Sequence, residues 1–165
     1  MSWSRRRLLG AALAGVPALP LLGGCSFTPV YATGSRADDL KGRIRVVAPE
    51  GASPFILGRF LEDSLGPPSD PGYVLSFTLD LDTESISITA TQDINRYNIT
   101  AIANWQLTET ATGDVVYSGV VDSFTSFSAT GTPVATSAAQ RDALDRLMRI
   151  LADKILAELL TGASA

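Results

Sequence analysis

The stretch Tyr73-Val74-Leu75-Ser76-Phe77-Thr78-Leu79-Asp80-Leu81-Asp82 decides the fold of this 165-residue chain. Large apolar side chains occupy every second position, and mostly polar or acidic ones lie between them. This period of two predicts a β-strand with one buried face and one face in water. Residues 97–108 repeat the pattern, so a second strand of the same kind is expected there.

A short strand and a helix are predicted before these two strands. Residues 43–49 form a short run that ends in proline, which is typical of a strand. Residues 53–66 predict a helix with one apolar stripe, since Ser53 is a suitable N-cap and Gly66 a suitable exit.

A hairpin, a loop and a long helix are predicted after them. Residues 111–114 contain a glycine that suits a hairpin turn and lead into a return strand at 115–121 that runs on toward Phe124. Residues 125–136 are rich in Ser, Thr and Gly and predict a loop. Ser137 and Gln140 have the spacing of a capping box, so the last helix is expected to begin there and to end at Gly162.

The order of these elements, β-α-β-β-β-α, predicts the fold class. Two helices with one apolar stripe each and a sheet with one apolar face bury each other as two layers. We therefore expect an α+β two-layer sandwich, with both helices on one face of a mostly antiparallel four-stranded sheet. This single domain would cover residues 43–162 and leave 163–165 as a C-terminal tail.

The N-terminus reads as an export signal that ends at the single cysteine. Three arginines, Arg5 to Arg7, precede an apolar run at 8–22, and two glycines then precede Cys25. This run is shorter than the roughly twenty apolar residues of a membrane span, so removal is expected. We predict a lipoprotein signal peptide over 1–24, lipidation of Cys25, and a tether over 25–42. An ordinary signal peptide is the alternative, and the arginines leave Sec and twin-arginine export both open.

Composition excludes several classes of function. After cleavage, ten basic residues stand against seventeen acidic ones, a net charge of 10 − 17 = −7, which disfavours nucleic acid. The chain has no histidine and no recognisable catalytic motif, so we expect no enzyme, no metal site and no cofactor besides the lipid on Cys25. A hydrolase is the remaining alternative, and its nominees are Asp80, Asp82, Glu84 and Asp93.

The start of the mature chain resembles that of a known family. The residues Gly24-Cys25-Ser26-Phe27-Thr28-Pro29-Val30-Tyr31 are similar to the first residues of the LPS-assembly lipoproteins of the LptE (RlpB) family, and residues 96–97, 105–107 and 138–143 agree with it. The resemblance implies a lipoprotein anchored in the outer membrane. There it would act as plug and assembly partner of the LptD β-barrel in lipopolysaccharide transport. The alternative is a periplasmic lipoprotein subunit of a lipid-transporting ABC system.

Two groups of side chains are candidate contacts. Asn98, Thr100, Asn104 and Gln106 form an uncharged polar row that suits the polar lumen of a barrel, although a solvated sheet face would look the same. Lys41, Arg43 and Arg45 alternate along the first predicted strand and are candidates for contact with anionic lipopolysaccharide or with acidic barrel residues. Charges that protect a sheet edge from pairing are the alternative for this basic group.

Overall fold

A computed structural model of the chain describes residues 40–88, 94–129 and 131–162. The predicted signal peptide, Cys25, most of the tether, Asp93 and the C-terminal tail lie outside these residues.

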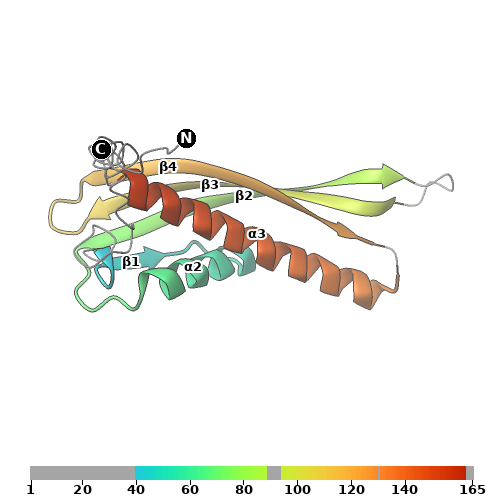
Figure 1. Cartoon of the computed structure of the whole chain (residues 1–165), viewed down its shortest axis with the longest axis horizontal. Coiled ribbons are helices and arrows are strands. Elements are labelled where there is room, and N and C mark those ends of the chain that lie inside the picture. The colour runs from blue at the N-terminus through green and yellow to red at the C-terminus, as the bar shows by residue number, and fades with distance from the viewer. Residues whose placement is uncertain (1–39, 89–93, 130, 163–165) are drawn as a thin grey trace, which may run out of the picture.

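The described residues form the predicted α+β sandwich (Figure 1). A four-stranded sheet in the order β1-β2-β3-β4 makes one layer, and two helices make the other. In chain order the elements are β1 (Ile44–Val47), α2 (Ala52–Leu65), β2 (Tyr73–Ile88), β3 (Ile94–Glu109), β4 (Val115–Ser128) and α3 (Pro133–Gly162). The predicted fold class and element order are confirmed.

The sheet is mixed, because its first strand runs parallel to its neighbour. β1 pairs with β2 in parallel from Ile44↔Tyr73 to Val47↔Ser76, while β2–β3 and β3–β4 are antiparallel. Parallel neighbours need a crossover connection, and α2 supplies it. β1 is shorter than the predicted 43–49, so only the first four residues of the 16-residue β2 have β1 beside them.

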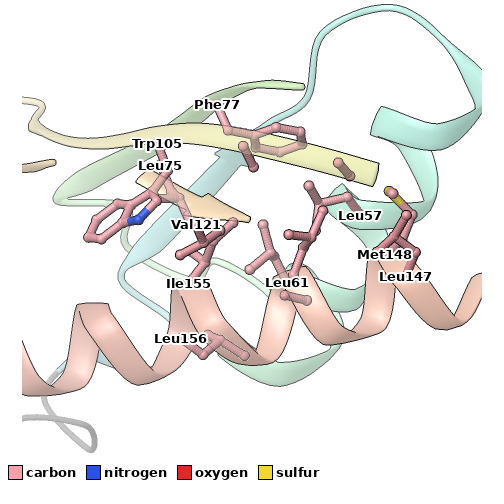
Figure 2. Packing of buried hydrophobic residues seen from close by; sticks show 14 of the residues in the cluster. Leu57, Leu61, Leu75, Phe77, Trp105, Val121, Leu147, Met148, Ile155 and Leu156 are labelled. Carbon is pink, nitrogen blue, oxygen red and sulfur yellow. The ribbon is translucent and has the colours of Figure 1, made fainter. Parts of the chain in front are cut away.

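The core lies between the inner face of the sheet and the two helices (Figure 2). Leu75 and Phe77 from β2 and Trp105 from β3 meet Leu61 of α2 and Ile155 of α3. The large side chains that are almost wholly buried are Ile44, Leu57, Leu61, Leu75, Ile99, Leu107, Leu147, Met148, Leu151, Ile155 and Leu159. In the strands these residues occupy alternate positions, and in α2 and α3 they recur at helical spacing.

A polar contact at the margin of this core joins the two layers. The indole Nε1 of Trp105 donates a hydrogen bond to Glu158 Oε2 at 3.0 Å, which joins β3 to α3. The contact passes over Gly119 of β4, where an added Cβ would lie 2.6 Å from that carboxylate oxygen and 2.7 Å from the indole nitrogen. A side chain at this position would therefore displace the bond.

Besides the bounds of β1, the start of α2 and the end of β4 differ from the prediction. α2 begins at Ala52 behind Gly51, and no side chain caps it, so Ser53 is not the cap. β4 continues to Ser128, because Phe127 is buried and its ring stacks on Tyr97 with centroids 5.3 Å apart. This burial outweighs the loop-like composition of 125–128.

The start of α3 also differs from the prediction. The helix begins at Pro133, and Thr132 Oγ1 accepts a hydrogen bond from the Ala135 N–H, which is the bond of an N-cap. Ser137 instead donates to the Pro133 carbonyl inside the first turns, so no capping box forms there. The exit of α2 agrees with the prediction, since Gly66 has a positive φ of 80° and its N–H donates to the Glu62 carbonyl.

Candidate functional site: the open face of the sheet

The face of the sheet turned away from α2 and α3 is open among the described residues. Both helices lie on the opposite side of the sheet (Figure 1). Of the predicted polar row, Thr100, Asn104 and Gln106 are exposed and Asn98 is half-buried. They alternate along β3 with the buried Ile99, Ala101, Ala103, Trp105 and Leu107, as expected for a strand with one wet face.

The middle of this face is hollowed. A shallow depression of about 660 Å³ lies over β2, β3 and β4 and is lined by Ser76, Phe77, Thr78, Asn104, Trp105, Gln106, Ser118, Gly119 and Val120. The side chains that share the open face here are hydroxyls and amides, with Val120 as the apolar member. The depression thus offers uncharged hydrogen-bonding groups to whatever covers it.

Sequence reasoning found only the β3 part of this depression. In the observed register, Thr78 and Val120 lie opposite Asn104, and Ser76 and Ser118 lie opposite Gln106. The period of two already assigned Ser76 and Thr78 to the wet face of their strand, whereas Ser118 and Val120 had no assigned face. Which of them lie side by side depends on the register, which the pattern alone does not define.

The predicted basic group does not form one row along a strand. Arg45 is exposed in β1, opposite Val74 and therefore on the open face. Arg43 precedes the strand, and its guanidinium lies 5.8 Å from the centre of the Tyr73 ring. Lys41 is exposed in the turn before it. The three cations are exposed at one end of the sheet, and only one of them is in a strand.

The other half of the open face is acidic. Asp80, Asp82 and Glu84 follow one another on the wet side of β2, and Asp122 of β4 lies across Ile102 from Asp80. Lys154 of α3 reaches β4, but its ammonium group donates to the backbone carbonyl of Asp122 and not to the carboxylate. Among the described residues no ion pair involves these four carboxylates, and the one that forms joins Arg146 to Asp142.

Exposed apolar side chains accompany the carboxylates. Ile102 is 42% exposed, Val120 60% and Phe124 69%, and all three lie on the open face. Val120 and Phe124 flank Asp122, the direct partner of Ile102, so each of the two lies diagonally next to Ile102. The open face therefore has three parts along its length. Arg45 lies at one end, the uncharged depression, or hollow, comes next, and the acidic half with its exposed apolar side chains follows.

No group of side chains that could hold a metal ion is found among the described residues. Asp80, Asp82 and Glu84, three of the residues considered for a hydrolase, succeed one another along the open face of β2, opposite Ile102, Thr100 and Asn98. Within residues 40–88, 94–129 and 131–162, no three acidic, histidine or cysteine residues are grouped so that they could hold a metal ion. In the same residues, no helix is both long and apolar enough to cross a membrane.

Residues 38–159 match the model of the lipopolysaccharide-assembly family LptE. The chain belongs to the LptE family. This match covers most of the chain and includes both layers of the fold, so it confirms the predicted family. Among curated protein sequences, none matches the chain significantly.

Solved structures of bacterial lipoproteins share the fold of this LptE-family chain. A lipoprotein from Caulobacter crescentus has a TM-score of 0.66 and 23% identity, over 78% of this chain and 96% of its own. Rare lipoprotein B from Shewanella oneidensis has a TM-score of 0.56 and 13% identity, over 73% of this chain and 94% of its own. A lipoprotein B from Nitrosomonas europaea has a TM-score of 0.57 and 14% identity, over 74% and 84% of the two chains. At these identities the likeness shows the LptE-like fold.

Proposed function

We propose that this LptE-family lipoprotein is anchored in the outer membrane by lipid on Cys25 and acts as plug and assembly partner of an LptD-type β-barrel. In that role it would support the passage of lipopolysaccharide to the outer leaflet. The match of residues 38–159 to the lipopolysaccharide-assembly family carries the proposal. We infer a non-enzymatic role, with the covalent lipid as the only bound group.

The anchor is inferred from the order of features in the N-terminus. An arginine cluster, an apolar run, two small residues and Cys25 succeed one another within the first 25 residues. A single acyl chain gives only marginal membrane binding, whereas the several chains of a mature bacterial lipoprotein anchor it stably. Ser26 follows the cysteine, and the family resemblance implies that this residue permits transfer to the outer membrane.

The open face of the sheet suits contact with the inside of a barrel. A barrel lumen is polar, and a protein that fills it needs side chains that form hydrogen bonds without carrying buried charge. Asn104, Gln106, Ser76, Thr78 and Ser118 supply such side chains around the depression. We infer that this uncharged hollow lies against the barrel wall, and that Asn98 and Thr100 extend the contact.

The basic end of the sheet is the proposed contact for lipopolysaccharide. Lys41, Arg43 and Arg45 are exposed there, and guanidinium and ammonium groups bind phosphate well. The acidic half of the open face would repel the same phosphates. A direct contact with lipid A is therefore proposed at the end of the molecule near β1.

Co-purification tests the proposal. The full chain is tagged at its C-terminus, extracted from native outer membrane in mild detergent, and its companions are identified by mass spectrometry. We expect a large β-barrel in near-stoichiometric amount. Recovery of the chain alone, or together with an inner-membrane ABC transporter, would contradict the barrel partnership, and the second result would support the alternative of an ABC-associated lipoprotein.

A further inference from the structure

Within residues 40–88, 94–129 and 131–162, the edge of β2 that faces β1 is open over most of its length. β1 ends at Val47, opposite Ser76, whereas β2 runs on to Ile88. No other described strand pairs with this edge. β2 and β3 extend past the end of α2 (Figure 1). Such an edge presents backbone donors and acceptors that another extended chain can use.

The direction of the free backbone groups follows from the bonds at the start of the strand. The N–H of Tyr73 donates to the Arg43 carbonyl on the β1 side. Since alternate residues of a strand point their backbone groups the same way, those of Leu79, Leu81 and Thr83 point to the open edge. The N–H of Thr83 is occupied by the Asp82 side chain at 2.9 Å, which leaves the groups of Leu79 and Leu81 available.

The side chains along this edge differ between its two faces. Asp80, Asp82 and Glu84 lie on the open face, about 7 Å apart at alternate positions. Leu79 and Leu81 lie on the other face, where Leu81 remains 41% exposed. An added strand would therefore meet a row of carboxylates on one face and aliphatic surface on the other.

A second copy of this chain does not fit the edge. Two β2 edges paired antiparallel around Asp82 would bring Asp80 of each copy opposite Glu84 of the other, and like charges directly opposite destabilise a strand pair. The cation nearest the row on the open face is Arg96, near the tip of the hairpin, and no ion pair joins it to the row among the described residues. The described part of the chain thus offers no paired cation to this row, and a partner can supply one.

We propose that the edge of β2 from Leu79 to Glu84 is a docking site for an extended segment of a partner protein that alternates basic and aliphatic side chains. The segment adds to the sheet as a fifth strand. Its backbone pairs with Leu79 and Leu81, its Lys or Arg side chains lie beside Asp80, Asp82 and Glu84, and its aliphatic side chains cover Leu81. Backbone pairing with alternate side-chain contacts is the general mode of β-strand addition.

A defined peptide tests this docking site on the full-length lipoprotein in non-ionic detergent. The probe is a fluorescent peptide of alternating lysine and valine, and its binding is followed by anisotropy. We expect binding that weakens with salt, together with slower hydrogen exchange at the Leu79 and Leu81 amides. A peptide of alternating glutamate and valine, and a lysine–valine peptide with N-methylated backbone, should not bind.

Two matched variants distinguish binding at the β2 edge from nonspecific attraction of the peptide to negative charge. The variant Asp80→Asn/Asp82→Asn/Glu84→Gln should bind the lysine–valine peptide at least about tenfold more weakly. The variant Asp142→Asn/Asp145→Asn/Asp153→Asn removes as many carboxylates from α3 and should bind it as the wild type does. The proposal would be overturned if the lysine–valine peptide did not bind, or if both variants lost the same affinity for it. Binding of the N-methylated peptide, or unchanged hydrogen exchange at the Leu79 and Leu81 amides, would also overturn it. The assay contains no barrel, so its outcome is independent of the proposed function.

Discussion

Trp105 and Glu158 are 53 residues apart in the chain and are joined by a hydrogen bond of 3.0 Å between the indole nitrogen and the carboxylate. The bond fixes the position of α3 over β3 and β4, and the missing side chain of Gly119 makes room for it. It also satisfies the one polar atom of a tryptophan ring that is otherwise buried in the core.

Replacement of this glycine should therefore destabilise the fold. In Gly119→Ala the new Cβ would lie 2.6 Å from Glu158 Oε2 and 2.7 Å from Trp105 Nε1, so the bond must break or the helix must shift. We expect a loss of about 1–3 kcal/mol in the free energy of unfolding, measured in urea. Ser118→Ala, at the exposed neighbouring position, is the control and should change it by less than about 0.5 kcal/mol. Equal stability of the two variants would contradict the close packing described.

The buried face of α3 should contribute more to the stability of the protein than its exposed face. Leu147 is fully buried between the layers, and Leu147→Ala should cost about 2–5 kcal/mol through lost burial and the cavity left behind. Ile150, on the same helix, is partly exposed, and Ile150→Ala should cost less than about 1 kcal/mol. Thermal or urea unfolding of the two variants measures the difference, and a reversed order would refute the assignment of the buried face.

The uncharged hollow should tolerate charge in the isolated protein but not in the complex. In the proposed complex, Asn104→Lys/Gln106→Lys would bury two ammonium groups at the interface with the barrel, so recovery of the barrel should fall at least about tenfold. Ser137→Lys/Gln140→Lys makes the same change on exposed positions of α3 and should leave recovery unchanged. Full recovery of the barrel with the first variant would place the hollow outside the interface.

The basic end of the sheet should govern affinity for lipopolysaccharide. Lys41→Gln/Arg43→Gln/Arg45→Gln removes three exposed cations and should weaken binding by about threefold or more, with a smaller effect at high salt. Arg141→Gln/Arg146→Gln/Arg149→Gln removes three cations from α3 and serves as the control. Unchanged affinity in the first variant, measured with immobilised lipopolysaccharide, would discard this contact.

Loss of Cys25, the proposed site of lipidation, should release the protein from the membrane. Cys25→Ser removes the thiol that would carry the lipid, so the chain should move from the membrane to the soluble fraction, or keep its signal uncleaved. Fractionation and intact-mass measurement distinguish these results from the wild type. A Cys25→Ser protein that stays in the outer membrane with its signal removed would show that another contact anchors it.

The buried face of each element was predictable from local pattern. Leu75, Phe77 and Trp105 occupy the apolar phase of their strands, and Leu147 and Ile155 the stripe of their helix; all five are buried. The boundaries were less predictable. The polar composition of 125–128 favoured a loop, whereas the stack of Phe127 on Tyr97, between two strands, keeps β4 extended.

Local pattern also predicted some residues of the candidate site, but it did not predict which of them lie side by side. Asn104 and Gln106 stood out because their strand alternates clearly, and the acids of β2 were visible on the wet side of theirs. The contribution of Ser118 to the hollow, and the position of Asp122 across Ile102 from Asp80, depend on how the strands pair. A shift of one residue in register would have moved them to the other face.

The sequence by itself determined the layers of this protein, because the period of side chains along a strand or helix is a local property that burial then selects. The tertiary structure decided the rest. It set the register that assembles the hollow from three strands, the short β1 that leaves the edge of β2 open, and the contact of Trp105 with Glu158 over Gly119. These features depend on contacts between residues far apart in the chain, and no local period specifies them.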